Sequence, residues 1–206
     1  MILKSDAIAK LLVEGESAED PLVITPSPSL EELKDSGSAS VDLRLGTWFV
    51  TLRQPRMTHL APEQRAAEYK LTKATYIRFG SEYYLHPNCF VLGATLEWIR
   101  LPGKLAGYVT AKSSWGRFGL IIATATGVHP GFSGCLTLEL TNVGELPIAI
   151  KPGMTLCQLF LHRVEESEDQ KLKNSRFAGR RKPHLGRIEM DGLAIKLSKA
   201  YGTLGP

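Results

Sequence analysis

Long apolar runs are missing from this sequence of 206 residues. A transmembrane helix needs about 18 or more consecutive apolar residues, and no such run occurs. The first residues, MILKSDAIAKLL, are interrupted by Lys4, Asp6 and Lys10, which is wrong for a secretory signal. They are typical of a short amphipathic helix with Ser5 as a candidate N-cap. We therefore expect no membrane partner.

Cysteine and histidine are scarce as well. The three cysteines, Cys89, Cys135 and Cys157, are far apart, which indicates reduced thiols in a cytoplasmic protein rather than a disulfide framework. None of the five histidines begins the His-x-Glu motif of zinc deaminases, and no two cysteines have zinc-ligand spacing. A phosphate-binding P-loop and a nucleophile elbow are also missing. Any hydrolytic chemistry is therefore expected to work without zinc, by acid–base and electrostatic means.

The composition is that of an ordinary globular protein. Hydrophobic residues make up 43% and charged residues 22%, with a net charge of +4. The length suits a single domain that can bury a sizeable core. We divide this domain, 1–206, into an N-terminal helix and irregular segment (1–39), a β core (40–164) and a basic C-terminal segment (165–206).

Short alternating segments dominate the β core. CLTLELTNV alternates between two strand faces. One face carries Leu136, Leu138 and Leu140, and the other carries Thr137, Glu139 and Thr141. LPIAIKPGMTLCQLFLHRV has the pattern of two strands joined by a turn at 151–154. Many short strands with frequent turns predict an antiparallel sandwich or barrel. One helical turn is expected at 29–34.

The C-terminal segment separates its charges. After an acidic run at 165–169, the stretch KLKNSRFAGRRKPHLGR, 171–187, carries seven Lys and Arg and no acid. Such a run is commonly a solvated tail, but it can also be a clamp that closes over phosphates. Its single aromatic residue, Phe177, offers no stacking platform for bases, so nucleic acid is not the favoured partner.

The stretch AKSSWGRFGL, 111–120, crowds polar and apolar groups together. Ser113 and Arg117 share one face if 114–119 forms a helical turn. Ser113 or Ser114 would then cap the turn, and its free amides would attract an anion. A plain N-cap beside a solvated arginine is the alternative.

Two further features are candidates for chemistry. Glu139 lies mid-strand, where it is either an exposed residue of a wet sheet face or a general base lining a pocket. The glycines of TATGVHPGFSG, 124–134, would let a ligand approach the backbone. His129 in this segment is a ligand contact, a titrating group or a surface residue. Taken singly, each of these features favours the simpler alternative.

Together these motifs resemble one family. KSSWGRFGL, HPGFSGCLTLELTN and LPIAIKPGMTLCQLFLHRV follow each other as in the deoxycytidine triphosphate deaminases of the deoxyuridine triphosphatase superfamily. The usual family forms are R-S-S-x-x-R-x-G-L, I-D-P-G-F/W-x-G-x-I/L-T-L-E and L-P-I/L-x-I/L-x-P-G-M. SASVDLRLG resembles the first core strand of the family, and the resemblance covers most of 1–187. The glutamate of T-L-E points to the deaminase branch.

The resemblance implies a distorted antiparallel β-barrel with a short N-terminal helix and few other helices. It also implies a homotrimer with active sites between subunits. The implied reaction is zinc-independent hydrolysis of dCTP to dUTP and ammonia. Water activated by Glu139 attacks C4 of cytosine, while Ser113 and Arg117 hold the water, polarise the ring and stabilise the intermediate. Mg²⁺ accompanies the substrate triphosphate.

The resemblance also assigns residues that bind the nucleotide, over which the basic C-terminal segment folds. They lie in the serine motif, the glycine-rich hairpin, two core strands and the tail: Lys112, Ser114, Thr126, Gly127, Val128, His129, Thr137, Gln158, Arg176, Phe177 and Arg180.

The sequence departs from the family pattern at several of these positions. Lys112 replaces an arginine and loses its bidentate fork. His129 replaces the aspartate that contacts the deoxyribose 3′-hydroxyl, and 120–130 is one residue short. In the tail, the family's K-Y-x-x-Q becomes R-F-A-G-R. Because the three catalytic positions are intact, we predict that deamination is retained and that nucleotide selectivity is open to change.

Three alternatives remain at this point. A dUTP pyrophosphatase, or a bifunctional deaminase that also releases pyrophosphate, would use the aspartate that His129 replaces, which ranks it lower. A non-catalytic nucleotide sensor or partner-binding module would fit the altered hairpin but leaves the Ser–Arg–Glu set without a purpose. A nucleic-acid-binding β domain rests on the basic tail alone.

Overall fold

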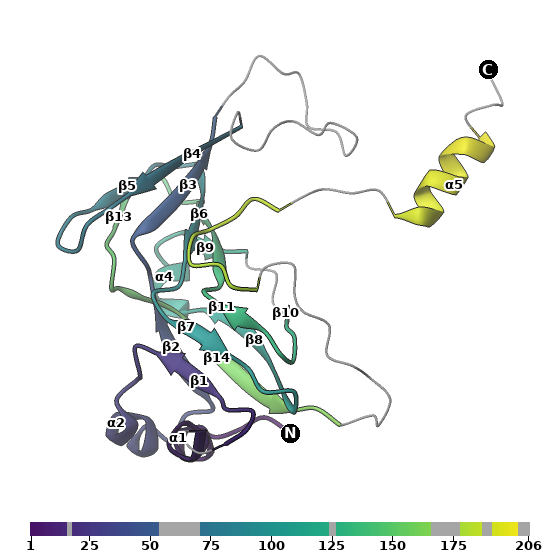
Figure 1. The fold of residues 1–206 in the computed structure, drawn as a ribbon. Coiled ribbons are helices and arrows are strands. Elements are labelled where there is room, and N and C mark those ends of the chain that lie inside the picture. Colours follow the sequence, from purple (N-terminus) through teal and green to yellow (C-terminus); the bar gives the residue numbers. More distant parts are fainter. Residues whose placement is uncertain (16–17, 54–70, 124–126, 166–177, 187–190, 202–206) are drawn as a thin grey trace.

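Antiparallel β-structure makes up most of the chain (Figure 1). The computed structural model describes residues 1–15, 18–53, 71–123, 127–165, 178–186 and 191–201. Its helices are α1 (Ser5–Glu14), α2 (Leu30–Asp35), α4 (Ser113–Gly116) and α5 (Gly192–Tyr201). Its strands are β1 (Val23–Thr25), β2 (Ser40–Arg44), β3 (Trp48–Leu52), β4 (Thr72–Tyr76), β5 (Tyr83–Leu85), β6 (Phe90–Ala94), β7 (Trp98–Arg100), β8 (Leu105–Ala111), β9 (Leu120–Ile122), β10 (Gly127–Val128), β11 (Ser133–Gly134), β12 (Thr137–Asn142), β13 (Ile148–Ile150) and β14 (Thr155–Arg163).

Two larger sheets carry the residues of interest. One has the strand order β10-β8-β14-β2, and the other has the order β4-β3-β6-β12-β9. Two smaller sheets, β1-β7-β11 and β13-β5, complete the described part of the chain. Every described pair of strands is antiparallel. The prediction of a mainly β, antiparallel fold with few helices is confirmed.

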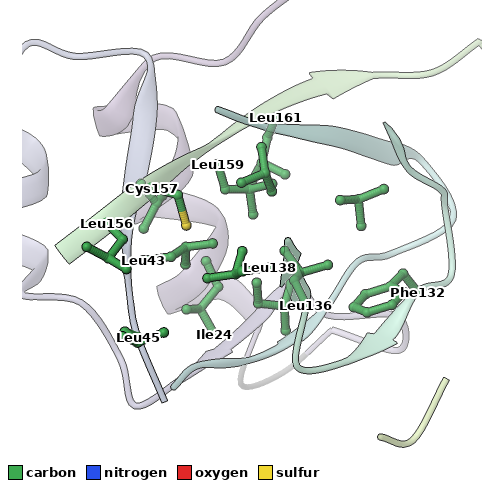
Figure 2. Packing of buried hydrophobic residues seen from close by; sticks show 14 of the residues in the cluster. Ile24, Leu43, Leu45, Phe132, Leu136, Leu138, Leu156, Cys157, Leu159 and Leu161 are labelled. Carbon is green, nitrogen blue, oxygen red and sulfur yellow. The ribbon is translucent and has the colours of Figure 1, made fainter. Parts of the chain in front are cut away.

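The hydrophobic core lies between the two larger sheets. Strand β12 alternates as its sequence predicts, because Leu138 and Leu140 are fully buried while the residues between them are only half-buried. In Figure 2, Leu138 points into the same apolar cluster as Leu43 of β2 and Leu159 of β14. The period of two in a strand therefore fixes which side chains fill the core and which face outward.

The N-terminal helices pack against each other beside this core (Figure 1). Helix α1 begins at Ser5, so its N-cap is Lys4, which makes no side-chain capping bond; the expectation that Ser5 is the cap is wrong. Helix α2 confirms the turn expected at 29–34, and its Ser29 side chain accepts a hydrogen bond from the Glu32 N–H. No helix among the described residues has the length and apolar character needed to cross a bilayer.

The turn expected at 151–154 is present between β13 and β14. The Met154 N–H donates to the Lys151 carbonyl at 3.1 Å, and Gly153 has φ of +91°, which favours glycine. The two strands do not pair with each other, however, because β13 pairs with β5 while β14 pairs with β8 and β2. Helix α5 was not predicted from the sequence.

We expect Leu138→Ala to lower the free energy of unfolding by about 2–5 kcal/mol, since it removes a fully buried side chain and leaves a cavity. Urea unfolding followed by circular dichroism measures this change. Leu146→Ala is the matched control, because Leu146 is 78% exposed and its truncation should change the stability by about 0.5 kcal/mol or less. Equal losses in both variants would contradict this view of the core.

Candidate active site

The serine motif forms the short helix α4 directly after β8. Lys112 is its N-cap residue and makes no side-chain capping bond, so the expectation that Ser113 or Ser114 caps the turn is wrong. The Arg117 N–H donates to the Ser113 carbonyl at 3.1 Å, which places Ser113 and Arg117 one helical turn apart. Both side chains are exposed, as is that of Ser114. The turn therefore presents its hydroxyls and its guanidinium to solvent.

A close backbone approach fixes the end of this turn. Gly119 has φ of +91°, and a Cβ at this position would lie 2.6 Å from the Gly144 nitrogen. The buried Asn142 side chain accepts from the Gly144 N–H at 2.9 Å and donates to the carbonyls of Leu85 and Leu146. The 116–119 turn is thus held against the turn that follows β12.

A row of polar side chains follows the outer face of the four-stranded sheet. The Lys112 ammonium lies 2.6 Å from the Asp42 carboxylate. Gln158 pairs with Asp42 in the strand register, and its amide group donates to the Thr110 hydroxyl at 3.2 Å and accepts from the Ser40 hydroxyl at 3.1 Å. The structure therefore brings two predicted nucleotide-binding residues, Lys112 and Gln158, to one surface.

Asp42 and Thr110 are members of this row that the sequence-based site omitted. The alternation in SASVDLRLG already places Asp42 on the polar side of its strand. Its ion pair with Lys112 depends on the pairing of β2 with β14 and of β14 with β8, which local patterns do not specify.

The glycine-rich hairpin begins with β10 at the edge of the same sheet. Gly127 pairs with Tyr108 of β8, and a Cβ on Gly127 would meet nothing within 4 Å, so this stretch of backbone is open to a ligand. Val128 is buried, which leaves its backbone as its only group for binding a ligand. His129 is exposed. Thr126 lies outside the described residues.

Glu139 lies on the outer face of the five-stranded sheet. It is half-buried, pairs with Leu92 of β6, and accepts a bond from the Ala123 N–H through its backbone carbonyl at 2.9 Å. Thr137 lies on the same face, opposite Ala94. Within the described part of the chain, the Glu139 carboxylate has no hydrogen-bond or ion-pair partner. A half-buried carboxylate without a partner is available to a ligand, a water or another chain.

The predicted catalytic residues lie on two different elements of the chain, Glu139 on β12 and Ser113 and Arg117 at α4. No hydrogen bond or ion pair among the described residues joins Glu139 to Ser113 or Arg117. The strand that follows the serine turn, β9, begins at Leu120, which pairs with Asn142 at the far end of β12 from Thr137. One chain thus supplies the carboxylate on one sheet and the serine–arginine turn at the end of another.

Part of the basic C-terminal segment lies along β11. The Gly179 N–H donates to the Ser133 carbonyl at 2.7 Å, and the Cys135 N–H donates to the Arg180 carbonyl at 2.8 Å. The Arg180 side chain is exposed. The tail residues Arg176 and Phe177 lie outside the described residues.

Two tryptophans anchor the cations that follow. The Lys182 ammonium lies 3.7 Å from the centre of the Trp48 ring, and the Arg181 guanidinium lies 5.1 Å from that of Trp98. Such contacts attract a cation to the face of an aromatic ring. Sequence reasoning missed both anchors, because each tryptophan lies more than 80 positions from its cation and nothing local links them.

The cysteines offer no reactive thiolate in the core. All three are free thiols, as predicted. Burial raises the pKa of Cys157 to about 12, and burial also raises the pKa of Cys135. A thiol whose pKa lies this far above neutrality is a poor nucleophile. In the described ranges, no three side chains of His, Cys, Asp or Glu gather as metal ligands.

A family model described as dCTP deaminase-like matches residues 2–164. The chain belongs to the dCTP deaminase-like family. This confirms the assignment made from the sequence motifs, and with it the prediction of an enzyme. The match ends at residue 164, one residue after the end of β14, so the basic tail lies outside it.

Curated relatives share much of the sequence of this deaminase-like chain. The dCTP deaminase, dUMP-forming, of Dictyoglomus thermophilum is 36% identical over 195 residues, which cover 93% of this chain and 96% of that protein. The dCTP deaminase of Natronomonas pharaonis is 34% identical with the same coverage. The dCTP deaminase, dUMP-forming, of Mycobacterium ulcerans is 43% identical over 150 residues, or 70% of this chain and 78% of that one.

Among solved structures, the 2′-deoxycytidine 5′-triphosphate deaminase from Agrobacterium tumefaciens has a similar fold. Its TM-score is 0.58 at 22% identity, and the match covers 80% of this chain and 46% of that one. At this identity the similarity speaks for the fold alone, and it agrees with the antiparallel β architecture predicted for the family.

We expect Lys182→Gln to loosen the tail, because the neutral amide loses the attraction to the Trp48 ring. Hydrogen exchange of the Cys135 and Gly179 amides should accelerate about two- to fivefold, the equivalent of one exposed cation–π contact. Lys104→Gln is the control, since Lys104 is exposed and makes no such contact in the described structure. Unchanged exchange in Lys182→Gln would show that the backbone bonds alone hold the tail.

Proposed function

We propose that the protein hydrolyses dCTP at C4 of cytosine and releases ammonia. The observation that carries this proposal is the family match together with the three intact positions Ser113, Arg117 and Glu139. The names of the curated relatives support cytosine nucleotide as the substrate. The cytoplasmic location expected from the sequence stays a prediction.

In the proposed mechanism, the Glu139 carboxylate accepts a proton from water as the water oxygen attacks C4. One proton of the water passes to ring N3 and the other to the exocyclic amino group, which leaves C4 as ammonia, so that dCTP and water become dUTP and ammonia. Ser113 and Arg117 supply donors that hold the water and stabilise the charge that develops on the ring, the role of preorganised dipoles in many hydrolases. No step uses zinc, and Glu139 can serve as the base because no described side chain competes for it.

The polar row of the four-stranded sheet fits the substrate's triphosphate. Lys112 and Gln158 offer an ammonium and an amide to phosphate oxygens, and exposed Ser114 offers a hydroxyl beside them. The substrate would enter as its magnesium complex, with the ion held by the phosphates. The hairpin at 127–129 and the anchored tail at Arg180 would close the site around the base, the sugar and the phosphates.

We further propose a homotrimer in which Glu139 of one subunit meets Ser113 and Arg117 of the next. The separation of these groups within one chain supports this arrangement. The sheet face around Glu139 also carries exposed apolar side chains, since Phe90 and Ile121 lie opposite Thr141 in the ladders and are 41% and 39% exposed. Exposed apolar patches of this kind are typical of interfaces.

A second product is favoured by the names of the relatives. Seven of the relatives, among them those of Dictyoglomus thermophilum and Mycobacterium ulcerans, are named dUMP-forming. A dUMP-forming enzyme also splits the triphosphate and releases pyrophosphate. The sequence-based expectation was dUTP, because His129 replaces the aspartate associated with pyrophosphate release. The two products are distinguished by measuring pyrophosphate beside ammonia.

Purified protein should release ammonia from dCTP, and Glu139→Gln should lower the rate by about a hundredfold or more, because a positioned general base typically contributes that factor. Nucleotide binding, measured by calorimetry, should persist in this variant. Glu145→Gln is the control, since Glu145 is exposed and outside the proposed site. Tight dCTP binding by the wild type without ammonia release would favour the nucleotide-sensor alternative, and wild-type turnover by Glu139→Gln would remove Glu139 from its role.

Chain mixing tests the shared site. Glu139→Gln and Ser113→Ala chains should each be inactive alone, because each lacks one half of the set. When the two are unfolded and refolded together, about a quarter of the sites should combine two intact halves and recover activity if neighbouring subunits build each site. A mixture that stays inactive would place both halves in one chain.

A further inference from the structure

Helix α4 is too short to determine its own orientation. It has four residues and no side-chain cap, whereas isolated helices of fewer than about 12 residues are marginal in water. Its exposed side chains include Ser113 and Arg117 at either end. The direction in which these two groups point must therefore be set by contacts made outside the helix.

A β-bulge in β14 supplies such contacts. The pairing of β14 with β2 shifts register between Thr155 and Cys157, so that Leu156 is an extra residue on this strand. The Leu156 carbonyl accepts from the Lys112 N–H at 2.9 Å. The Thr155 carbonyl accepts from the Trp115 indole N–H at 3.0 Å. Two successive carbonyls at the bulge thus hold the beginning and the middle of the serine turn.

We propose that Trp115 is a positioning residue whose indole N–H, bonded to the Thr155 carbonyl, fixes the turn that carries Ser113 and Arg117. Indole has a single donor, and its partner here is a backbone atom of the sheet rather than a mobile side chain. The ring is also partly buried against the hydrophobic core. The inference rests on the proposed function for its effect on rate.

The hydrogen bond from Trp115 to Thr155, which we call the Trp115 clamp, should affect catalysis more than substrate binding. Trp115 lies two residues from Ser113 and two from Arg117, so rotation of the turn displaces both groups. A displacement of about 1 Å at a catalytic group can cost about a hundredfold in rate. Two of the proposed phosphate contacts are held by bonds that do not involve the Trp115 side chain. Lys112 bonds to Asp42 and Leu156. Gln158 bonds to Ser40 and Thr110. Ser114 is the one proposed phosphate contact that lies within the turn, so substrate affinity should change less than the rate does.

Two variants separate the N–H from the ring. Trp115→Phe removes the donor and part of the ring, and the analogue 3-benzothienylalanine at position 115 keeps the bicyclic shape but has sulfur in place of N–H. We expect kcat for ammonia release from dCTP to fall about ten- to hundredfold in both, with KM changed by less than about threefold. Tyr84→Phe is the control, because it deletes an aromatic donor on β5, outside the proposed site, and should leave kcat and KM unchanged.

The benzothienyl variant decides the outcome, because its packing is preserved even if Trp115→Phe fails to fold. Wild-type kcat in this variant would overturn the proposal. If the wild-type protein releases no ammonia, the proposed function fails, but the clamp can still be tested by hydrogen exchange of the Gly116 and Arg117 amides. Exchange about tenfold faster in the benzothienyl variant would support the clamp, and unchanged exchange would overturn it.

Discussion

Strand alternation in β12 is the constraint on which the site depends. Leu138 and Leu140 are fully buried, and their burial leaves no choice for the residue between them. Glu139 must therefore face outward, because an unpaired carboxylate buried in the core would destabilise the fold. The same strand ends in Asn142, whose bonds hold the turn that contacts the serine motif. The core therefore orients both parts of the proposed catalytic set.

The two halves of the proposed catalytic set lie on different elements of the chain, Glu139 on β12 and the serine–arginine turn at α4. The carboxylate belongs to a sheet face with exposed apolar side chains, whereas the serine turn belongs to the end of a polar sheet face. Neither face alone carries the carboxylate together with the serine and the arginine. A symmetric assembly of identical chains would supply both halves to every site.

Much of this could be predicted from the sequence, and the failures have physical causes. The alternation around Glu139 is a local period and predicted the strand correctly. The prediction that a serine caps the serine turn was wrong. Pairing with β14 extends β8 to Ala111, so the next residue, Lys112, is the N-cap. The ring contacts of Arg181 and Lys182 depend on residues far away in the chain. Long-range pairing is what local patterns leave undetermined.

In the proposed site, the ion pair between Lys112 and Asp42 would influence which ligands bind. Without a ligand, the ammonium is already neutralised, so the surface has little surplus charge with which to attract passing anions. A nucleotide gains Lys112 only by offering more negative charge than one carboxylate does. Under the proposed function, opening this pair would favour a triphosphate over a monophosphate, because the triphosphate carries more negative charge.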